Sequence, residues 1–374
     1  MFNFLFENKS CGWLVGMENL LKQQTVREAK LYRRLGNGKV ECILCERRCV
    51  LGEGEKGYCK TRINLNGKLY TLVYGDLSAV ESRPIEIKPF FHYWVGSTAL
   101  TFSTWSCNFN CPWCQNFSLS KVEPNPIKSN FFPPEKVVDL ALRFGDEGLC
   151  ASFQEPTLLT EWVLDLFKLG SKKGLYCCYV SNGYMTLEAL KLLKLSGLDG
   201  LKIDVKGDAE VYKSFCGGVD VEKVWRNAHE AKRMGIHVEI VNLVVTGVND
   251  DDECLRWVIE RHLKEVGSET PLHFTRYHPA YKFNNPPTKI ETLEKAYRMA
   301  KREGVLYPYI GNVYGHMGEN TYCPNCGKLL IGRLGCRVVE YKLTKEKKCP
   351  NCGFKIAVTG KFVDKTLKKS FLLF

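Results

Sequence analysis

The chain has 374 residues, of which 45% are hydrophobic, and its 53 Lys and Arg against 41 Asp and Glu give a formal net charge of +12. No apolar run reaches the ~18 residues that a membrane-spanning helix needs, and the basic residues are scattered rather than gathered in one block. This composition excludes a membrane-spanning protein, disfavours a nucleic-acid partner and leads us to expect a soluble, cytoplasmic protein.

The first part of the chain, residues 1–97, is expected to form an N-terminal extension and a cysteine-rich preface. Residues 1–16 lack the basic start and the cleavage site of a signal peptide, so we expect translation to begin at Met17. Beyond that point the pattern predicts a short helix near Leu20 to Leu35 and a hairpin around Asn64 to Lys68.

The 18 cysteines are concentrated in groups at metal-ligand spacing, which indicates a reducing compartment rather than a disulfide framework. One group lies in the preface and consists of Cys42, Cys45, Cys49 and Cys59. Four thiolates at this spacing suit either zinc or an auxiliary iron–sulfur cluster, and we favour zinc.

Residues 98–318 show a different pattern, in which short apolar runs alternate with amphipathic stretches. The seven apolar runs are Ala99 to Trp105, Leu149 to Phe153, Leu175 to Val180, Gly200 to Val205, Val238 to Val245, Leu272 to Tyr277 and Val305 to Ile310. Strands that alternate with helices are typical of right-handed βαβ units and a parallel sheet. We therefore predict an α/β fold, a partial (β/α) barrel, with its active site where the carboxyl ends of the strands meet.

A second cysteine group, Cys107, Cys111 and Cys114, directly follows the first predicted strand. A 4Fe-4S cluster normally takes four protein thiolates, so three of them leave one iron free for another ligand. Zinc would want a fourth ligand nearby, and a dithiol redox site would not need Cys107. The group therefore predicts a 4Fe-4S cluster with an open coordination position.

Polar side chains follow several of the other predicted strands. Ser181 and Asn182 suit a ribose or a carboxylate, and Asp204 and Lys206 are two apart on one strand, so they point to the same side. His278 is the histidine best placed for chemistry, and we expect it and Lys206 to be catalytic residues or cofactor contacts. The alternatives are a structural ion pair for Asp204 and Lys206 and a structural role for His278.

The run Cys107 to Cys114 resembles the cluster-binding motif of the radical S-adenosylmethionine (SAM) superfamily, in which the open iron binds SAM. The resemblance implies that Trp113 lies near the adenine and that Glu155 binds the cofactor's amino group. By itself, Glu155 before Pro156 also reads as the start of a helix. The superfamily more often has Gly-Gly-Glu at this place, and Gln154 departs from that pattern.

The chain is similar to the enzymes that activate glycyl-radical proteins, such as the pyruvate formate-lyase activating enzyme, and more similar to the radical SAM enzymes of the AmmeMemoRadiSam system. The matching segments are Cys42 to Cys49, Gly57-Tyr58-Cys59, Cys114-Gln115-Asn116, Glu155-Pro156-Thr157 and Gly318 to Cys323. That system's name discloses no substrate.

The last part of the chain, residues 319–374, is expected to form a zinc-ribbon-like segment followed by a basic tail. Its ligands would be the cysteines of two Cys-Pro-Asn-Cys-Gly knuckles, Cys323, Cys326, Cys349 and Cys352. Zinc is favoured over rubredoxin-like iron. Among the remaining cysteines, which we expect to be small buried hydrophobes, Cys216 alone stands out because two glycines follow it.

The leading hypothesis is an enzyme that reductively cleaves SAM at a 4Fe-4S cluster and uses the resulting 5′-deoxyadenosyl radical to abstract hydrogen from a substrate. The substrate would be a glycine of a protein partner, or alternatively a small molecule or another macromolecule. A ferredoxin or flavodoxin would supply the electron. A different class stays open, a zinc-ribbon nucleic-acid-binding protein with a structural cluster, although basic and aromatic clustering is missing.

Overall fold

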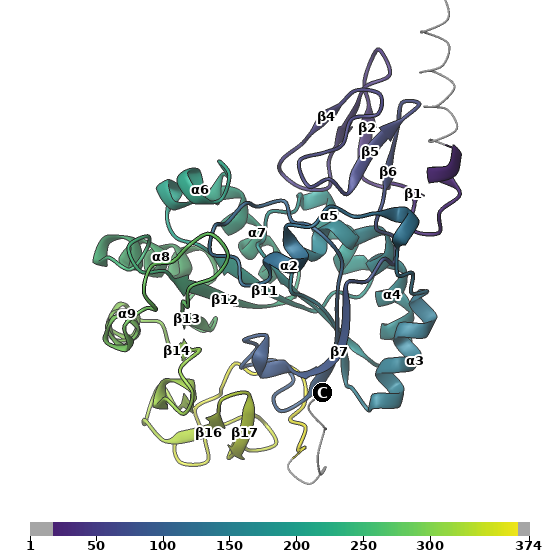
Figure 1. The fold of residues 1–374 in the computed structure, drawn as a ribbon. Coiled ribbons are helices and arrows are strands. Elements are labelled where there is room, and N and C mark those ends of the chain that lie inside the picture. Colours follow the sequence, from purple (N-terminus) through teal and green to yellow (C-terminus); the bar gives the residue numbers. More distant parts are fainter. Residues whose placement is uncertain (1–17, 366–374) are drawn as a thin grey trace, which may run out of the picture.

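The computed structural model describes residues 18–365, so the predictions about Met17 and about the end of the basic tail lie outside the described residues. The centre of the molecule is an eight-stranded sheet in the order β14-β13-β12-β11-β10-β9-β8-β7 (Figure 1). Its strands are β7 (Ala79–Pro84), β8 (Thr98–Ser103), β9 (Gly148–Ala151), β10 (Tyr176–Ser181), β11 (Gly200–Val205), β12 (His237–Val244), β13 (Leu272–Arg276) and β14 (Pro308–Gly311). Strands β8 to β14 run parallel, and β7 pairs antiparallel with β8.

The seven parallel strands confirm the α/β fold that the sequence predicts, with β14 beginning a few residues later than expected. Strands β9, β10 and β11 are buried along almost their whole length, because helices cover the outer side of the sheet (Figure 1). These helices are α3 (Pro134–Phe144), α4 (Thr160–Lys172), α5 (Leu187–Leu195), α6 (Ala209–Phe215), α7 (Val221–Arg233), α8 (Asp252–Glu265) and α9 (Ile290–Glu303).

Short polar side chains start four of these helices. Thr186, Asp208, Asp220 and Asp251 each accept a hydrogen bond from a backbone N–H of the first turn, which satisfies a donor that has no partner inside the helix. These caps fix where each loop at the carboxyl end of a strand turns back into a helix.

The preface folds as two small antiparallel sheets. One contains β1 (Arg27–Glu28), β5 (Arg62–Leu65) and β6 (Lys68–Thr71), and the other contains β2 (Tyr32–Arg34), β3 (Val40–Cys42) and β4 (Val50–Leu51). The hairpin of β5 and β6 confirms the sequence prediction.

The helix predicted near Leu20 to Leu35 is wrong, since within that range only residues 20 and 21 are helical. The backbone that follows pairs with β6 and β3 instead, and this pairing buries Val26, Ala29 and Leu31. Burial against the two small sheets outweighs the weak helical preference of the polar residues between them.

The preface and the C-terminal segment lie at opposite ends of the central sheet (Figure 1). The preface covers the carboxyl end of the sheet, where the backbone of Cys45 forms an isolated β-bridge with that of Met185, just after β10. The C-terminal segment, with β15 (Thr321–Tyr322), β16 (Leu329–Leu334) and β17 (Arg337–Tyr341), packs on Tyr307 and Tyr309 at the amino end. The active site of an α/β barrel lies at the carboxyl end, so the preface is the part that adjoins it.

Candidate active site

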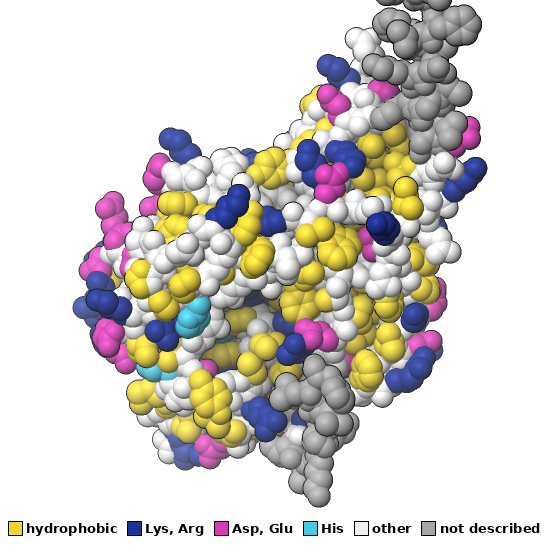
Figure 2. Space-filling view, viewed as in Figure 1, with side chains coloured by type: hydrophobic (Ala, Val, Ile, Leu, Met, Phe, Trp, Pro, Cys, Tyr) yellow, Lys and Arg dark blue, Asp and Glu magenta, His cyan; other side chains and the backbone are white. Residues whose placement is uncertain are grey.

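A cavity of about 400 Å³ lies inside the curve of the central sheet. Glu81 and Arg83 of the edge strand β7 line it, and so does Asn312, which follows the opposite edge strand β14. The two edge strands of the sheet therefore face the same cavity but do not pair with each other, as expected for a partial barrel. Figure 2 shows the surface hollowed between these two edge strands.

The loop after β8 brings Cys107, Cys111 and Cys114 to this cavity. The backbone N–H of Phe109 donates to the Cys107 sulfur at 3.4 Å, and the Cys114 sulfur lies 3.1 Å from the Ser120 hydroxyl. These contacts hold the loop in shape around the cavity.

The spacing of the three sulfurs indicates what they could hold. Within residues 18–365, no three of these or the preface cysteines bring their ligand atoms within 4.8 Å of one another, whereas the C-terminal cysteines do. A single tetrahedral ion pulls its thiolates closer than this, while a four-iron cube holds them further apart. The donor set at the cavity therefore fits a 4Fe-4S cluster with three protein ligands.

Cys216 lies beside this loop, its sulfur 3.8 Å from that of Cys111. The hydrogen bond with Cys216, opposed by burial and supported by Lys206, lowers the pKa of Cys111 to about 7. A thiol with this pKa is about half ionised at pH 7, and the thiolate is the form that binds iron. The sequence singled out Cys216 only because of its neighbouring glycines.

Glu155 is almost completely buried, and its carboxylate accepts four hydrogen bonds. The donors are the Thr157 backbone N–H at 3.1 Å, the Thr157 hydroxyl, the Ser181 hydroxyl at 2.8 Å and the Asn182 backbone N–H at 2.8 Å. Burial raises the pKa of Glu155, and these donors offset part of the rise. Glu155 thus caps the short 3-10 helix Pro156–Leu159, as its place before Pro156 indicates, and also lines the cavity.

Two charged side chains of β11, Lys202 and Asp204, line the cavity together with Lys206, which directly follows the strand. The Lys202 ammonium lies 2.7 Å from one oxygen of Asp204, and that of Lys206 lies 3.9 Å from the other. Burial opposes the charge on Asp204, but the two lysines outweigh it and lower its pKa. Alternation along the strand thus brings Asp204 and Lys206 together, and the same rule could have found Lys202, two residues earlier.

The other predicted site residues fall in different places. Trp113 is buried, lines the cavity and packs against Phe215 and Phe283 at ring distances of 5.5 and 5.6 Å. Asn182 lines the cavity, and Ser181 contacts it only through Glu155. His278 is exposed and is not among the lining residues, because β13 ends at Arg276 and the chain then leaves the sheet.

Two cavity residues carry a signal that sequence reasoning did not use. Gln154 is 8% exposed, and neither its amide oxygen nor its amide nitrogen has a hydrogen-bond partner among residues 18–365. Its neighbour Phe153 has a φ of 73°, a conformation that suits glycine and is strained for a phenylalanine. Unpaired buried amides and backbone strain are common where a ligand completes the site.

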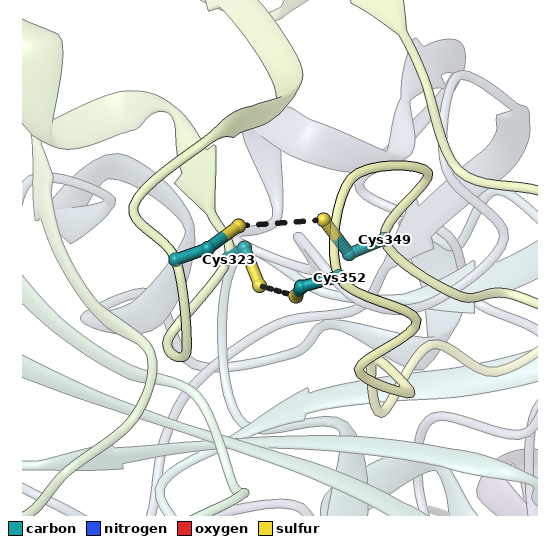
Figure 3. A group of neighbouring side chains, drawn as sticks. Cys323, Cys349 and Cys352 are labelled. Carbon is teal, nitrogen blue, oxygen red and sulfur yellow. Dashed lines mark hydrogen bonds between the residues drawn. The ribbon is translucent and has the colours of Figure 1, made fainter.

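The C-terminal cysteines converge from the two knuckles and form a closed site (Figure 3). The Cys323 and Cys352 sulfurs are 3.5 Å apart, and those of Cys326 and Cys349 are 3.7 Å apart. Four thiolates around one ion at about 2.3 Å would lie close to this spacing. The group can therefore hold a single metal ion, while Cys336 stays outside it.

The preface cysteines also converge, in a less compact arrangement. Cys42, Cys45, Cys49 and Cys59 line one small cavity, together with Arg62 and Asn108. Asn108 directly follows Cys107, so this cavity adjoins the three-cysteine loop.

Within residues 18–365, no helix combines the length and the apolar character needed to cross a membrane.

Comparison with known proteins agrees with this site. The model of the radical SAM superfamily matches residues 103–258, which include the three-cysteine loop and strands β9 to β12. An uncharacterised protein of Methanocaldococcus jannaschii, MJ0808, is 41% identical over 89% of this chain and 99% of its own length.

Two more distant relatives carry functional names. The GTP 3′,8-cyclase of Aquifex aeolicus is 24% identical over 61% of this chain and 77% of its own length. A putative glycyl-radical enzyme activating enzyme of Methanocaldococcus jannaschii, MJ1227, is 25% identical over 40% of this chain and 62% of its own length. The three-cysteine loop and these matches together show that the chain is an enzyme and that its residues 103–258 form a radical SAM superfamily domain.

Proposed function

We propose that the chain holds a 4Fe-4S cluster on Cys107, Cys111 and Cys114, binds SAM in the adjoining cavity and abstracts hydrogen from a substrate bound there. The observation that carries this proposal is the group of three cysteines that share one cavity at a spacing too wide for a single ion. When bound, the cluster and SAM supply a 5′-deoxyadenosyl radical through one-electron cleavage of the sulfonium.

The residues of the cavity would bind and orient the cofactor. The unpaired amide of Gln154, the carboxylate of Glu155 and the charged groups Asp204 and Lys206 offer polar partners for the amino and carboxylate groups of SAM. Trp113 offers an aromatic face near the loop for the adenine. We make no such assignment for His278, which lies at the surface.

For the substrate, we propose a glycine of a protein partner, so that the enzyme acts as a glycyl-radical activating enzyme. Support comes from the relative MJ1227 and from the hollow between the unpaired edges β7 and β14, through which a chain segment could reach the cavity. We also propose that the enzyme belongs to the AmmeMemoRadiSam system, which the cysteine-rich preface supports. A ferredoxin or flavodoxin would donate the electron, and zinc would occupy the C-terminal site.

A second candidate is the radical modification of an anionic small molecule. Arg83, Lys88 and Lys202 give the cavity several basic side chains, which would suit a phosphate or carboxylate group. The GTP 3′,8-cyclase relative also supports this alternative.

The test is anaerobic incubation of the reconstituted protein with dithionite and SAM, followed by measurement of 5′-deoxyadenosine. We expect formation by the native protein, loss in Cys111→Ala and retention in Cys336→Ala, which removes a cysteine outside all three groups. Absence of product from the native protein, or full activity of Cys111→Ala, would contradict the proposal. Deuterium transfer into 5′-deoxyadenosine from a glycine-deuterated protein or from a deuterated nucleotide then separates the two candidates.

A further inference from the structure

The four cysteines of the preface come from separate parts of its two small sheets. Cys42 ends β3, Cys45 and Cys49 lie in the connection to β4, and Cys59 precedes β5. All four line one cavity, and none of them forms a disulfide. Such convergence of free thiols from distant positions is typical of a metal site in a reducing compartment.

The chain itself provides a measure of what these thiols could hold. The C-terminal sulfurs lie at 3.5 and 3.7 Å in pairs, as expected around one ion, whereas no three of the preface sulfurs lie within 4.8 Å of one another. The preface group shares this wider spacing with Cys107, Cys111 and Cys114. The preface spacing therefore differs from that of the single-ion site in the same molecule and is compatible with the wider spacing of an iron–sulfur cluster site.

The surroundings of the preface group favour a large anionic ligand. Arg62 is 1% exposed at this cavity, and its Nε and Nη1 atoms have no hydrogen-bond partner among the described residues; only Nη2 is engaged, by Glu161 and the Leu158 carbonyl. The Nδ2 atom of Asn108 is likewise buried without a partner within residues 18–365. Thiolates and sulfides would accept hydrogen bonds from these donors, whose burial without partners is otherwise unfavourable.

The four preface cysteines also lie beside the three-cysteine loop. Asn108 contacts both, because it lines the preface cavity and follows Cys107, and its oxygen accepts a hydrogen bond from the Asn182 amide at 2.7 Å. Arg47 fixes the two parts to each other, since it donates to the Asn108 carbonyl at 3.0 Å and to the Gly217 carbonyl at 2.6 Å. On the other side, Cys49 is only partly buried and Tyr58, which lines the preface cavity, is 43% exposed, so this side of the cavity lies close to the surface.

We propose that Cys42, Cys45, Cys49 and Cys59 hold a second 4Fe-4S cluster, in place of the zinc that the sequence favoured, and that this cluster relays electrons to the catalytic one. The relay rests on the proposed function. One electron leaves a reduced ferredoxin or flavodoxin, resides on the second cluster and passes to the cluster on the three-cysteine loop. No bond is made or broken and no proton moves in this step.

The metal content of a variant without the catalytic loop cysteines tests the site. In Cys107→Ala/Cys111→Ala/Cys114→Ala, reconstituted anaerobically, we expect about four iron atoms and about four sulfides per chain, with about one zinc at the C-terminal site. A variant that folds but contains about two zinc ions and no iron would overturn the inference. This variant cannot cleave SAM by the proposed mechanism, so its iron content decides the second site independently of the proposed function.

Circular dichroism shows whether the triple variant folds. If it does not, the iron count of the native protein decides, because two clusters require about eight iron atoms and one cluster about four. Cys336→Ala is the matched control and should keep the native count.

Freeze-quench electron paramagnetic resonance of the native protein tests the relay. After mixing with a reduced ferredoxin, the signal that SAM does not perturb should appear first, and the SAM-sensitive signal should follow. The reverse order of the two signals would overturn the electron relay. The metal at the preface cysteines would then still be decided by the iron count.

Discussion

At the scale of single residues, Gln154 is the clearest case of a side chain that the folded chain alone does not satisfy. Both polar atoms of its amide are buried without a partner among residues 18–365, and an unsatisfied buried polar group costs about 1–3 kcal/mol. We predict that Gln154→Met stabilises the protein by about 1 kcal/mol and weakens SAM binding at least tenfold. Thermal unfolding without SAM and equilibrium dialysis with SAM measure the two effects.

The opposite signs of these two effects distinguish a ligand contact from a structural role. The same replacement at the exposed Gln24 is the control, and it should change neither stability nor SAM affinity. If Gln154→Met destabilised the protein and left SAM affinity unchanged, the amide would be a structural group.

Residue by residue, the sequence predicts those parts of the site that depend on local rules. The loop cysteines follow from spacing, and Asp204 with Lys206 follows from alternation along a strand. Arg83 and Lys88 reach the cavity only because β7 joins the sheet edge, and no local pattern shows this. His278 stands at the end of an apolar run, but its side chain is exposed, which depends on the path of the chain after β13.

At the scale of elements, periodicity predicts the buried parallel strands well and the short exposed strands badly. Strands β8 to β11 are buried along almost their whole length because both faces are covered. Strands β1 and β2 have only two and three residues and are largely exposed, so their sequence carries no alternation. They are strands because they pair with β6 and β3, and a local sequence pattern cannot predict such pairing.

The C-terminal segment is an element whose stability we expect to depend on a metal ion at its four cysteines. Its core packs Leu330, Ile331 and Ile356 against Tyr309, and the four cysteines of its two knuckles bring their sulfurs within 4.8 Å of one another. We predict that Cys349→Ser loses about one zinc ion and increases hydrogen exchange in residues 321–358. Zinc analysis and hydrogen-exchange mass spectrometry measure these effects.

Cys336→Ser is the matched control in the same segment, because Cys336 lies outside the four-cysteine group. It should keep the zinc and the native exchange rates. If Cys349→Ser kept its zinc, or if exchange rose equally in the central sheet, the site would not be an independent structural element.

At the scale of the whole molecule, buried histidines make stability depend on pH. Burial lowers the pKa of both His92 and His262 to about 3, against an ordinary value of 6.5. Because the unfolded chain binds these protons first, each histidine contributes stability at neutral pH that is lost as pH falls below 6.5. Each should cost about 2 kcal/mol between pH 7 and pH 5.

His262→Gln tests this dependence. The His262 Nε2 atom lies 3.0 Å from the Thr270 carbonyl, and a glutamine can donate the same hydrogen bond without titrating in this range. The loss of unfolding free energy between pH 7 and pH 5, measured by urea denaturation under anaerobic conditions, should shrink by about 2 kcal/mol relative to the native chain.

Glu239 also makes stability depend on pH, but outside the range between pH 5 and pH 7. Glu239 is buried against His237 and His273; burial opposes its charge, but these partners outweigh it and lower its pKa, so its contribution is lost only below its ordinary value of 4.5. His278→Gln, a substitution of an exposed side chain, is the control and should leave the slope unchanged. An unchanged slope in His262→Gln would mean that the acid sensitivity of the molecule arises elsewhere.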